Sequence, residues 1–304
     1  MLRKVSTKQS IYSFSLNELR DLFLENGLKK FAADQVYDWC YRKLCFSPDE
    51  WSNISKGARL FLKDNYAHQL PEIVWNGESV DGTIKFLFKM SDGQTVESVL
   101  IKGPNRLTQC LSTQVGCAIG CTFCHTATMG LKRHLSSDEI VGQFLKAKSW
   151  LRENKPELNL TNIVYMGQGE PLHNFNNTKK ATEIFMEGKG IALGQRKITL
   201  STSGLVPQIK KLVDFPPVNI AISLHSARDN VRTELMPINK VYDLKRLFEA
   251  IKEIPLKAHR RITYEYLLID GLNNGPEDVE ALANLLHRKE SKINLIPFIF
   301  LSLL

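Results

Sequence analysis

The sequence predicts an α/β fold: a partial (β/α)6 barrel preceded by a small N-terminal helical domain and a β-hairpin linker. Short β-rich apolar runs alternate six times with longer amphipathic stretches after about residue 107. Polar and glycine-rich motifs follow those runs, and 304 residues suffice for one large core plus an accessory domain. We therefore expect domains at residues 1–70, 71–103 and 104–304.

The first domain is predicted to be helical. Ser15 and Glu18 form an S-x-x-E capping box at the start of one helical stretch. A second stretch carries apolar residues at helical spacing through Phe31, Val36 and Trp39. The linker follows as a β-hairpin, because TIKFLFKM and QTVESVLI alternate like strands around a turn at residues 91–93.

Six apolar runs are the predicted barrel strands: TQCLSTQV, NIVYM, KITLST, NIAISL, RITYEYLLI and INLIPF. The motifs GCAIGCTFC, GQGEP, STSG, SLH and IDGLNN come directly after the strands. Barrels of parallel strands carry their chemistry on the loops at the carboxyl ends of the strands. The motifs therefore predict an active-site rim.

Charge and hydropathy narrow the class of protein. The net charge of +8 suits a polyanionic partner such as nucleic acid, although charge alone does not decide this. The basic start MLRKVSTKQS is not followed by an apolar run of signal-peptide length, and no run of about 20 apolar residues occurs. We expect a cytoplasmic protein whose cysteines are reduced and available as ligands or catalytic groups.

Cys117, Cys121 and Cys124 offer three thiolates on one short loop. A cubane [4Fe–4S] cluster held by three thiolates leaves one iron open. That iron could chelate the amino and carboxylate groups of S-adenosylmethionine (SAM), which the reduced cluster would cleave to a 5′-deoxyadenosyl radical. A structural zinc site is the alternative, but zinc normally takes four protein ligands and no second C-x-x-C pair is present.

This C-x-x-x-C-x-x-C spacing, with Phe123 before the last cysteine, resembles the radical SAM superfamily signature. The segment CLSTQVGCAIGCTFCHTATMGLKRHLSSDEIVGQ resembles the RlmN/Cfr family of RNA adenosine methyltransferases. So do DGTIKFLF, VESVLI, MGQGEPL, ITLSTSGLVP, AISLHS, MPINK and INLIP, and the likeness is closer to RlmN. The resemblance implies a [4Fe–4S] cluster, SAM, an electron donor for the cluster and no membrane. It further implies methylation of carbon 2 of adenosine in 23S rRNA and tRNA, whereas Cfr-type members target carbon 8.

The resemblance also assigns residues. SAM would be bound just past predicted strands, by Gly169, Glu170, Ser201, Ser223, Leu224 and His225. Cys110 would be the thiol that resolves a covalent protein–RNA intermediate, and Glu97 the proton acceptor. Without the resemblance, ordinary structural roles would explain these residues: a βα turn, helix caps, a structural histidine and a solvated carboxylate.

Other features remain less specific. Cys40 lies on an apolar helix stripe and is expected in the core, while Cys45 has no assignment. RNA contacts are expected where basic and aromatic residues alternate, at Trp39, Tyr41, Arg42 and Lys43, and at residues 132–134.

The sequence departs from the family after INLIP. Family members continue through an Asn that contacts SAM and on to a methyl-carrying Cys, but here the Asn position is Ile299 and the sequence stops at Leu304. We therefore expect that the C-terminal end of the core is missing, and that this chain cannot complete methyl transfer. The alternatives are a noncatalytic iron–sulfur RNA-binding remnant, or another radical SAM enzyme that needs no carrier Cys.

Overall fold

The structure, a computed structural model, describes residues 8–256 and 260–298. A nine-stranded sheet runs through it in the order β1-β2-β3-β4-β7-β8-β9-β10-β11. The strands are β1 Glu72–Glu78, β2 Ile84–Lys89, β3 Thr95–Gly103, β4 Arg106–Cys110, β7 Leu160–Tyr165, β8 Ile198–Thr202, β9 Asn219–Ser223, β10 Ile262–Leu268 and β11 Ser291–Pro297. From β4 onward all neighbours pair in parallel, so the six predicted barrel strands are confirmed.

Helices connect the parallel strands, as a (β/α) architecture requires. They are α4 His125–Thr128, α5 Ser137–Asn154, α6 Phe175–Met186, α7 Val206–Ile209, α8 Asp229–Leu235, α9 Leu244–Lys252 and α10 Pro276–Leu285, with short 3-10 helices η3 Gln195–Lys197, η4 Lys210–Asp214 and η5 Pro237–Lys240. In α9 the residues at helical spacing, Leu244, Leu247 and Ile251, are buried against the sheet side of the molecule. Two short strands, β5 Gln114–Val115 and β6 Arg133–His134, form a separate antiparallel ribbon.

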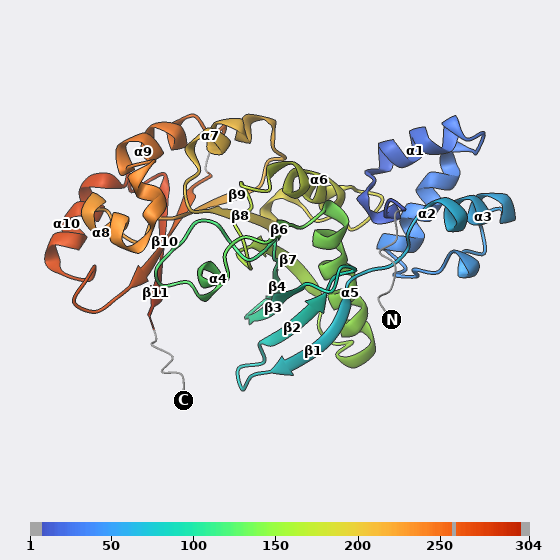
Figure 1. Ribbon diagram of the computed structural model, residues 1–304, viewed down its shortest axis with the longest axis horizontal. Coiled ribbons are helices and arrows are strands. Elements are labelled where there is room, and N and C mark those ends of the chain that lie inside the picture. The colour runs from blue at the N-terminus through green and yellow to red at the C-terminus, as the bar shows by residue number, and fades with distance from the viewer. Residues whose placement is uncertain (1–7, 257–259, 299–304) are drawn as a thin grey trace.

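The N-terminal domain is helical, as predicted. It contains η1 Ile11–Ser13, α1 Leu16–Glu25, α2 Lys30–Tyr41, η2 Pro48–Glu50 and α3 Lys56–Asn65, and it lies at one end of the molecule (Figure 1). The Ser15–Glu18 capping box at the start of α1 is present. Cys40 is 2% exposed within this domain's core, which confirms its expected place.

The β2–β3 hairpin is also present, and its turn includes Gly93 with a φ of +87°. The hairpin pairs with β1 on one side and β4 on the other, so it continues the barrel sheet. One face of β3 and β4 is covered by α5, because the buried Gln109 side chain donates hydrogen bonds to Ser98 Oγ and to the Gln143 carbonyl oxygen. The opposite face is therefore turned away from α5.

The N-terminal domain docks on the barrel through polar contacts. Arg42 donates to the carbonyl oxygens of Gly188 and Gly190, and Arg152 donates to the Lys43 carbonyl oxygen. Tyr41 is 2% exposed. The RNA contact expected of Tyr41 is therefore wrong, because its ring offers no free stacking face. Arg42 is exposed and its guanidinium joins the two domains, so its RNA contact stays a prediction.

Candidate active site

The cysteine loop begins directly after β5 and closes on itself. Gly116 has a φ of +75°, and a Cβ added there would lie 1.7 Å from the Gly130 carbonyl oxygen, so only glycine fits. The Cys117 N–H donates to that same carbonyl oxygen, and the Cys124 N–H donates to the Cys121 carbonyl oxygen. These bonds close the loop that carries the three cysteines, all of which are partly exposed.

The thiols of the loop influence one another electrostatically. The pKa of Cys121 is raised to about 12, mainly by burial and in smaller part by the nearby thiols of Cys124 and Cys117. Burial likewise raises the pKa of Cys117. Three thiolates at this spacing are costly unless a metal compensates their charge, which fits iron–sulfur ligation. In the described ranges, however, no three His, Cys, Asp or Glu side chains already stand where they could hold a metal ion.

The loop is anchored on the region of α8. The Thr122 N–H donates to the Leu235 carbonyl oxygen, and Phe123 packs with a small core that includes Leu235 and Met236. The Phe123 ring also meets the His225 ring edge to face, with 4.8 Å between centroids. His225 thus links the cysteine loop to the end of β9.

The GQGEP turn after β7 requires both of its glycines. A Cβ on Gly167 would lie 2.7 Å from the Leu111 backbone. Gly169 has a φ of +98°, and its Cβ would lie 2.5 Å from the Gln114 side chain. The turn is consequently packed closely against the segment that leads into the cysteine loop.

Glu170 fastens this turn to the loop after β8. It is 4% exposed; one carboxylate oxygen accepts from the Leu172 N–H at 3.0 Å and the other from the N–H and hydroxyl of Ser203 at 2.8 and 2.7 Å. Burial raises the pKa of Glu170, and the Ser203 donors oppose that shift. Much of the carboxylate's accepting capacity is therefore used within the protein.

The ends of β8 and β9 are held by a buried guanidinium. Arg232, which is fully buried, donates to the carbonyl oxygens of Ser203, Ser223 and Leu224, and to Asn239 Oδ1. Its bonds place Ser223 and Leu224 beside the Glu170–Ser203 contact, while Ser201 lies at the end of β8 and is 8% exposed. The predicted SAM residues thus share one edge of the sheet.

His225 has an unusual backbone and a fixed ring. Its φ is +57°, a conformation that few non-glycine residues adopt. The ring Nδ1 accepts a hydrogen bond from the Leu267 N–H at 3.0 Å. Burial lowers the pKa of His225 to about 3, with a further contribution from the positive Arg232, so the ring is neutral at physiological pH.

Glu97 and Cys110 lie on the same face of the sheet. Val99 on β3 is directly opposite Cys110 on β4, and Glu97 is two residues from Val99 on the same strand. This face is the one turned away from α5. Glu97 forms an ion pair with Lys85 at 2.6 Å, and burial raises the pKa of the Cys110 thiol to about 12.

The comparisons with known proteins agree with this arrangement. Residues 111–286 match the model of the Radical SAM superfamily, and residues 9–67 match the Ribosomal RNA large subunit methyltransferase N-terminal domain. A protein of Aquifex aeolicus named "Probable dual-specificity RNA methyltransferase RlmN" is 44% identical over 95% of this chain and 83% of its own length. The chain belongs to the RlmN family of radical SAM methyltransferases.

Further relatives extend the match. An RlmN relative from Staphylococcus saprophyticus is 43% identical over 95% of this chain and 79% of its own length. A crystal structure of a radical SAM methyltransferase from Sphaerobacter thermophilus superposes with a TM-score of 0.87 at 39% identity, covering 94% of this chain and 84% of that one. The RlmN assignment confirms the family, fold and enzyme class expected from the sequence. Ile299 and Leu304, on which the expected departure from the family rests, lie outside the described residues.

Three residues of this RlmN site escaped the sequence analysis: Gln114, Ser203 and Arg232. Gln114 and Ser203 stand inside motifs that were recognised, but nothing in their spacing marks them as contacts of the GQGEP turn. Arg232 belongs to a helical stretch in which a lone arginine normally indicates a solvated position. Their roles follow only from the residues opposite them.

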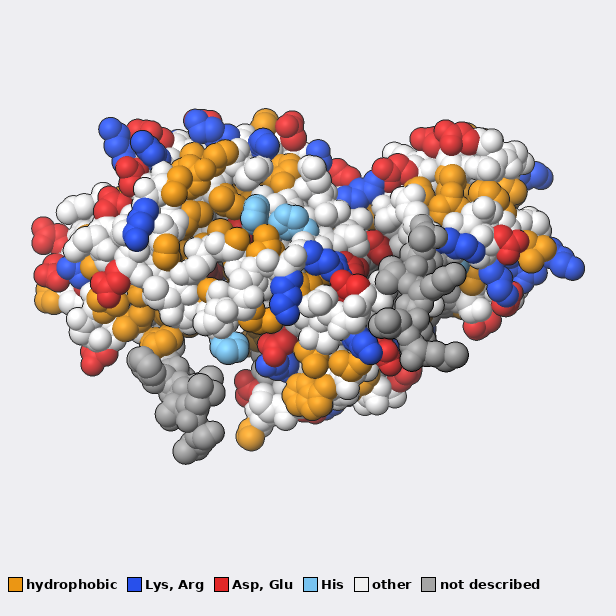
Figure 2. Space-filling view, viewed as in Figure 1, with side chains coloured by type: hydrophobic (Ala, Val, Ile, Leu, Met, Phe, Trp, Pro, Cys, Tyr) orange, Lys and Arg blue, Asp and Glu red, His pale blue; other side chains and the backbone are white. Residues whose placement is uncertain are grey.

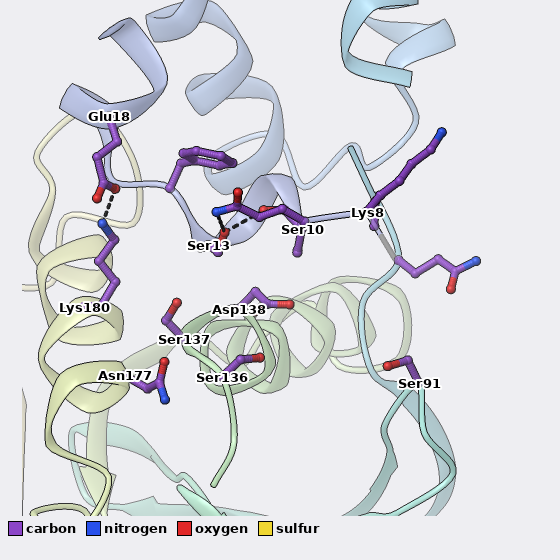
Figure 3. Close-up of a pocket in the computed structure, with 14 residues that line it drawn as sticks. Lys8, Ser10, Ser13, Glu18, Ser91, Ser136, Ser137, Asp138, Asn177 and Lys180 are labelled. Atoms are coloured by element: carbon purple, nitrogen blue, oxygen red, sulfur yellow. Dashed lines mark hydrogen bonds and ion pairs between the residues drawn. The ribbon is translucent and has the colours of Figure 1, made fainter. Parts of the chain in front are cut away.

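A cavity of about 600 Å³ at the domain junction is separate from the site (Figure 3). There Glu18 of α1 forms an ion pair with Lys180 of α6, while Ser136, Ser137 and Asp138 at the start of α5 face Ser10 and Ser13. None of the predicted site residues lines it, so it belongs to the seam between the domains.

Among the described helices, none combines the length and apolar character needed to cross a membrane.

Proposed function

We propose that the chain uses a [4Fe–4S] cluster and SAM to methylate carbon 2 of an adenosine in RNA. The observation that carries the proposal is RlmN membership over nearly the whole chain, because the relatives matching 95% of it are named dual-specificity RNA methyltransferases. The net charge of +8 suits such a polyanionic substrate. We propose 23S rRNA and tRNA as the substrates, met in the cytoplasm.

Cys117, Cys121 and Cys124 would hold the cluster. Three protein ligands leave one iron for the amino and carboxylate groups of SAM. When bound, the cluster supplies the electron that cleaves SAM to a 5′-deoxyadenosyl radical, and a separate electron donor must renew that electron. The anchoring of the loop through Thr122 and Phe123 would fix where SAM is presented.

SAM would lie against the carboxyl ends of β7, β8 and β9. Gly169 and Glu170 follow β7, Ser201 is the last but one residue of β8, Ser223 ends β9, and Leu224 and His225 follow β9. These strands are neighbours in the sheet, so their ends form one continuous rim. Glu170 and Arg232 would act by holding the rim in position.

Glu97 and Cys110 would act on the RNA base. A shared face of the sheet offers a carboxylate and a thiol that burial keeps protonated at neutral pH. Lys85 positions the Glu97 carboxylate through their ion pair. This arrangement supports the assignment of Glu97 as proton acceptor and Cys110 as resolving thiol.

The test begins with anaerobic reconstitution of the 304-residue chain with iron and sulfide. Visible absorption reports the cluster, and release of 5′-deoxyadenosine after addition of SAM and a reductant reports cleavage. Cys121→Ala should lose both signals, whereas the matched control Cys45→Ala, a partly exposed thiol outside the loop, should keep both. A chain that forms no cluster would overturn the proposal.

The substrate is tested on the same samples with unmodified 23S rRNA fragments and tRNA, followed by mass spectrometry of the digested nucleosides. 2-Methyladenosine supports the proposed target carbon, and 8-methyladenosine would reassign the reaction to the Cfr type. Release of 5′-deoxyadenosine without any methylated nucleoside would support the radical step and contradict the proposed methylation.

A further inference from the structure

Two histidines at the rim are joined by one buried glutamine. His134 ends the β5–β6 ribbon that flanks the cysteine loop, and His173 follows the GQGEP turn by two residues. Their rings meet edge to face with 5.0 Å between centroids. Gln114, which is fully buried, lies beneath both.

The hydrogen bonds of Gln114 determine which ring nitrogens carry the protons. Its carbonyl oxygen accepts from the Glu170 N–H at 2.8 Å, which fixes the orientation of the amide. Its amide nitrogen then donates to Nδ1 of His134 at 2.9 Å and to Nδ1 of His173 at 3.4 Å. Since both Nδ1 atoms accept, both neutral rings carry their proton on Nε2, on the side away from Gln114. Both histidines are exposed, so the structure presents two outward N–H donors next to each other.

These rings line a cavity of about 520 Å³ whose charged side chains are mainly basic. Lys179 and Lys211 line it together with one acidic residue, Asp214. Neither lysine has an ion-pair partner within residues 8–256 and 260–298. Histidine side chains lie together near the middle of the face drawn in Figure 2, with Lys and Arg side chains close to them.

The first turn of α6 contributes to the same cavity. Residues 174–177 line it, and among the described residues no side chain caps the start of this 12-residue helix. Asn174 would be the cap, but its Oδ1 accepts from the Asn177 side-chain amide, and its Nδ2 donates inward to the carbonyl oxygens of Thr113 and Leu135. The unbonded N–H groups of a helix start favour an anion, and here they add to the histidine and lysine donors.

We propose that this cavity binds a backbone phosphate of the RNA substrate, an inference that rests on the proposed function. Phosphate oxygens are the acceptors that outward N–H groups, lysines and a helix start recognise in nucleic-acid complexes. A phosphate bound between His134 and His173 would lie beside the GQGEP turn, because Gln114 contacts both rings and the Glu170 N–H. The cavity thereby holds the RNA strand at the edge of the SAM site.

The experiment measures binding of the reconstituted chain to a labelled 23S rRNA stem–loop by fluorescence anisotropy over a salt series. Lys211→Gln should weaken binding about fivefold and lower the slope of log affinity against log salt by about 0.7 to 0.9, the value for one lost phosphate contact. The double variant His134→Phe, His173→Phe removes both Nε2–H donors and keeps the aromatic rings, so it should weaken binding by a similar factor. Lys210→Gln is the matched control: Lys210 is adjacent in sequence, does not line the cavity and pairs with Glu253 at 3.1 Å.

Release of 5′-deoxyadenosine in the absence of RNA should be unchanged in every variant. That result shows that each variant is folded and carries its cluster. If the wild type binds RNA and the cavity variants bind equally well, the phosphate site is wrong while the proposed function stands. If Lys211→Gln weakens competition by inorganic phosphate but not RNA binding, the cavity serves a small phosphate and the RNA contact is likewise wrong. If the wild type binds no RNA at all, the proposed function itself fails.

Discussion

Acidification should destabilise the folded chain through His225. Burial lowers the pKa of this ring to about 3 in the folded state, whereas an unfolded chain has the ordinary histidine value of about 6.5. Below pH 6.5 the unfolded chain therefore binds more protons, and stability is lost as pH falls from about 6.5 toward 3. From these two values, the loss between pH 7 and pH 5 is about 2 kcal/mol.

The hydrogen bond of the His225 ring also predicts that acidification destabilises the folded chain. Nδ1 accepts from the Leu267 N–H, so a proton on Nδ1 would bring two donors face to face. The assay is urea unfolding of the cluster-free chain at several pH values, compared with His225→Asn. Asn tolerates the positive φ of this position but does not titrate, so other acidic transitions cancel in the comparison. The wild-type advantage in unfolding free energy should shrink by about 2 kcal/mol from pH 7 to pH 5. Parallel pH profiles for the two proteins would refute the reasoning.

Three further predictions concern the scaffold. Gly167→Ala places a Cβ 2.7 Å from the Leu111 backbone and should cost about 1 to 3 kcal/mol, seen as a lower thermal midpoint; an unchanged midpoint would show that the turn adapts. Arg232→Met leaves four acceptors without their donor and should lower the free energy of unfolding in urea by about 3 kcal/mol or more, at about 1 kcal/mol for each unsatisfied group. A loss under about 1 kcal/mol would mean that the acceptors find other partners. Arg42→Gln should speed hydrogen exchange around Gly188 by weakening domain docking, and identical exchange would assign the docking to other contacts.

Relatedness to RlmN explains why many features are recognisable in the amino-acid sequence. The strand runs have the right length and composition, and the turn residues stand between them, so local pattern suffices for the sheet and the hairpin. The Cys117–Cys124 spacing lies within one loop, and short-range geometry is encoded in adjacent residues. The glycines of the GQGEP motif are visible in the sequence, but only the structure identifies the Leu111 backbone and the Gln114 side chain as the groups that approach Gly167 and Gly169.

The N-terminal domain shows where local pattern misleads. Aromatic and basic residues alternate at Trp39 to Lys43 in a way typical of RNA-binding surfaces, yet Tyr41 is buried and Arg42 joins the domains. The same residues fit a helix that packs on a neighbouring domain. Whether these residues face RNA or a neighbouring domain depends on what lies opposite each side chain in the folded chain.

By itself the sequence determined the order of strands and helices, the cysteine loop and the family. Only the tertiary structure decided that Glu170 meets Ser203, that Arg232 holds the ends of β8 and β9, and that Gln114 joins two rim histidines. Hydrophobic periodicity and motif spacing depend on residues that are close together in the sequence, so they can be recognised from the sequence alone. These contacts join residues from 8 to 59 positions apart. Those of Glu170 and Arg232 form because parallel strands bring their carboxyl ends to one edge of the sheet, and the Gln114–His134 contact forms across the antiparallel β5–β6 ribbon.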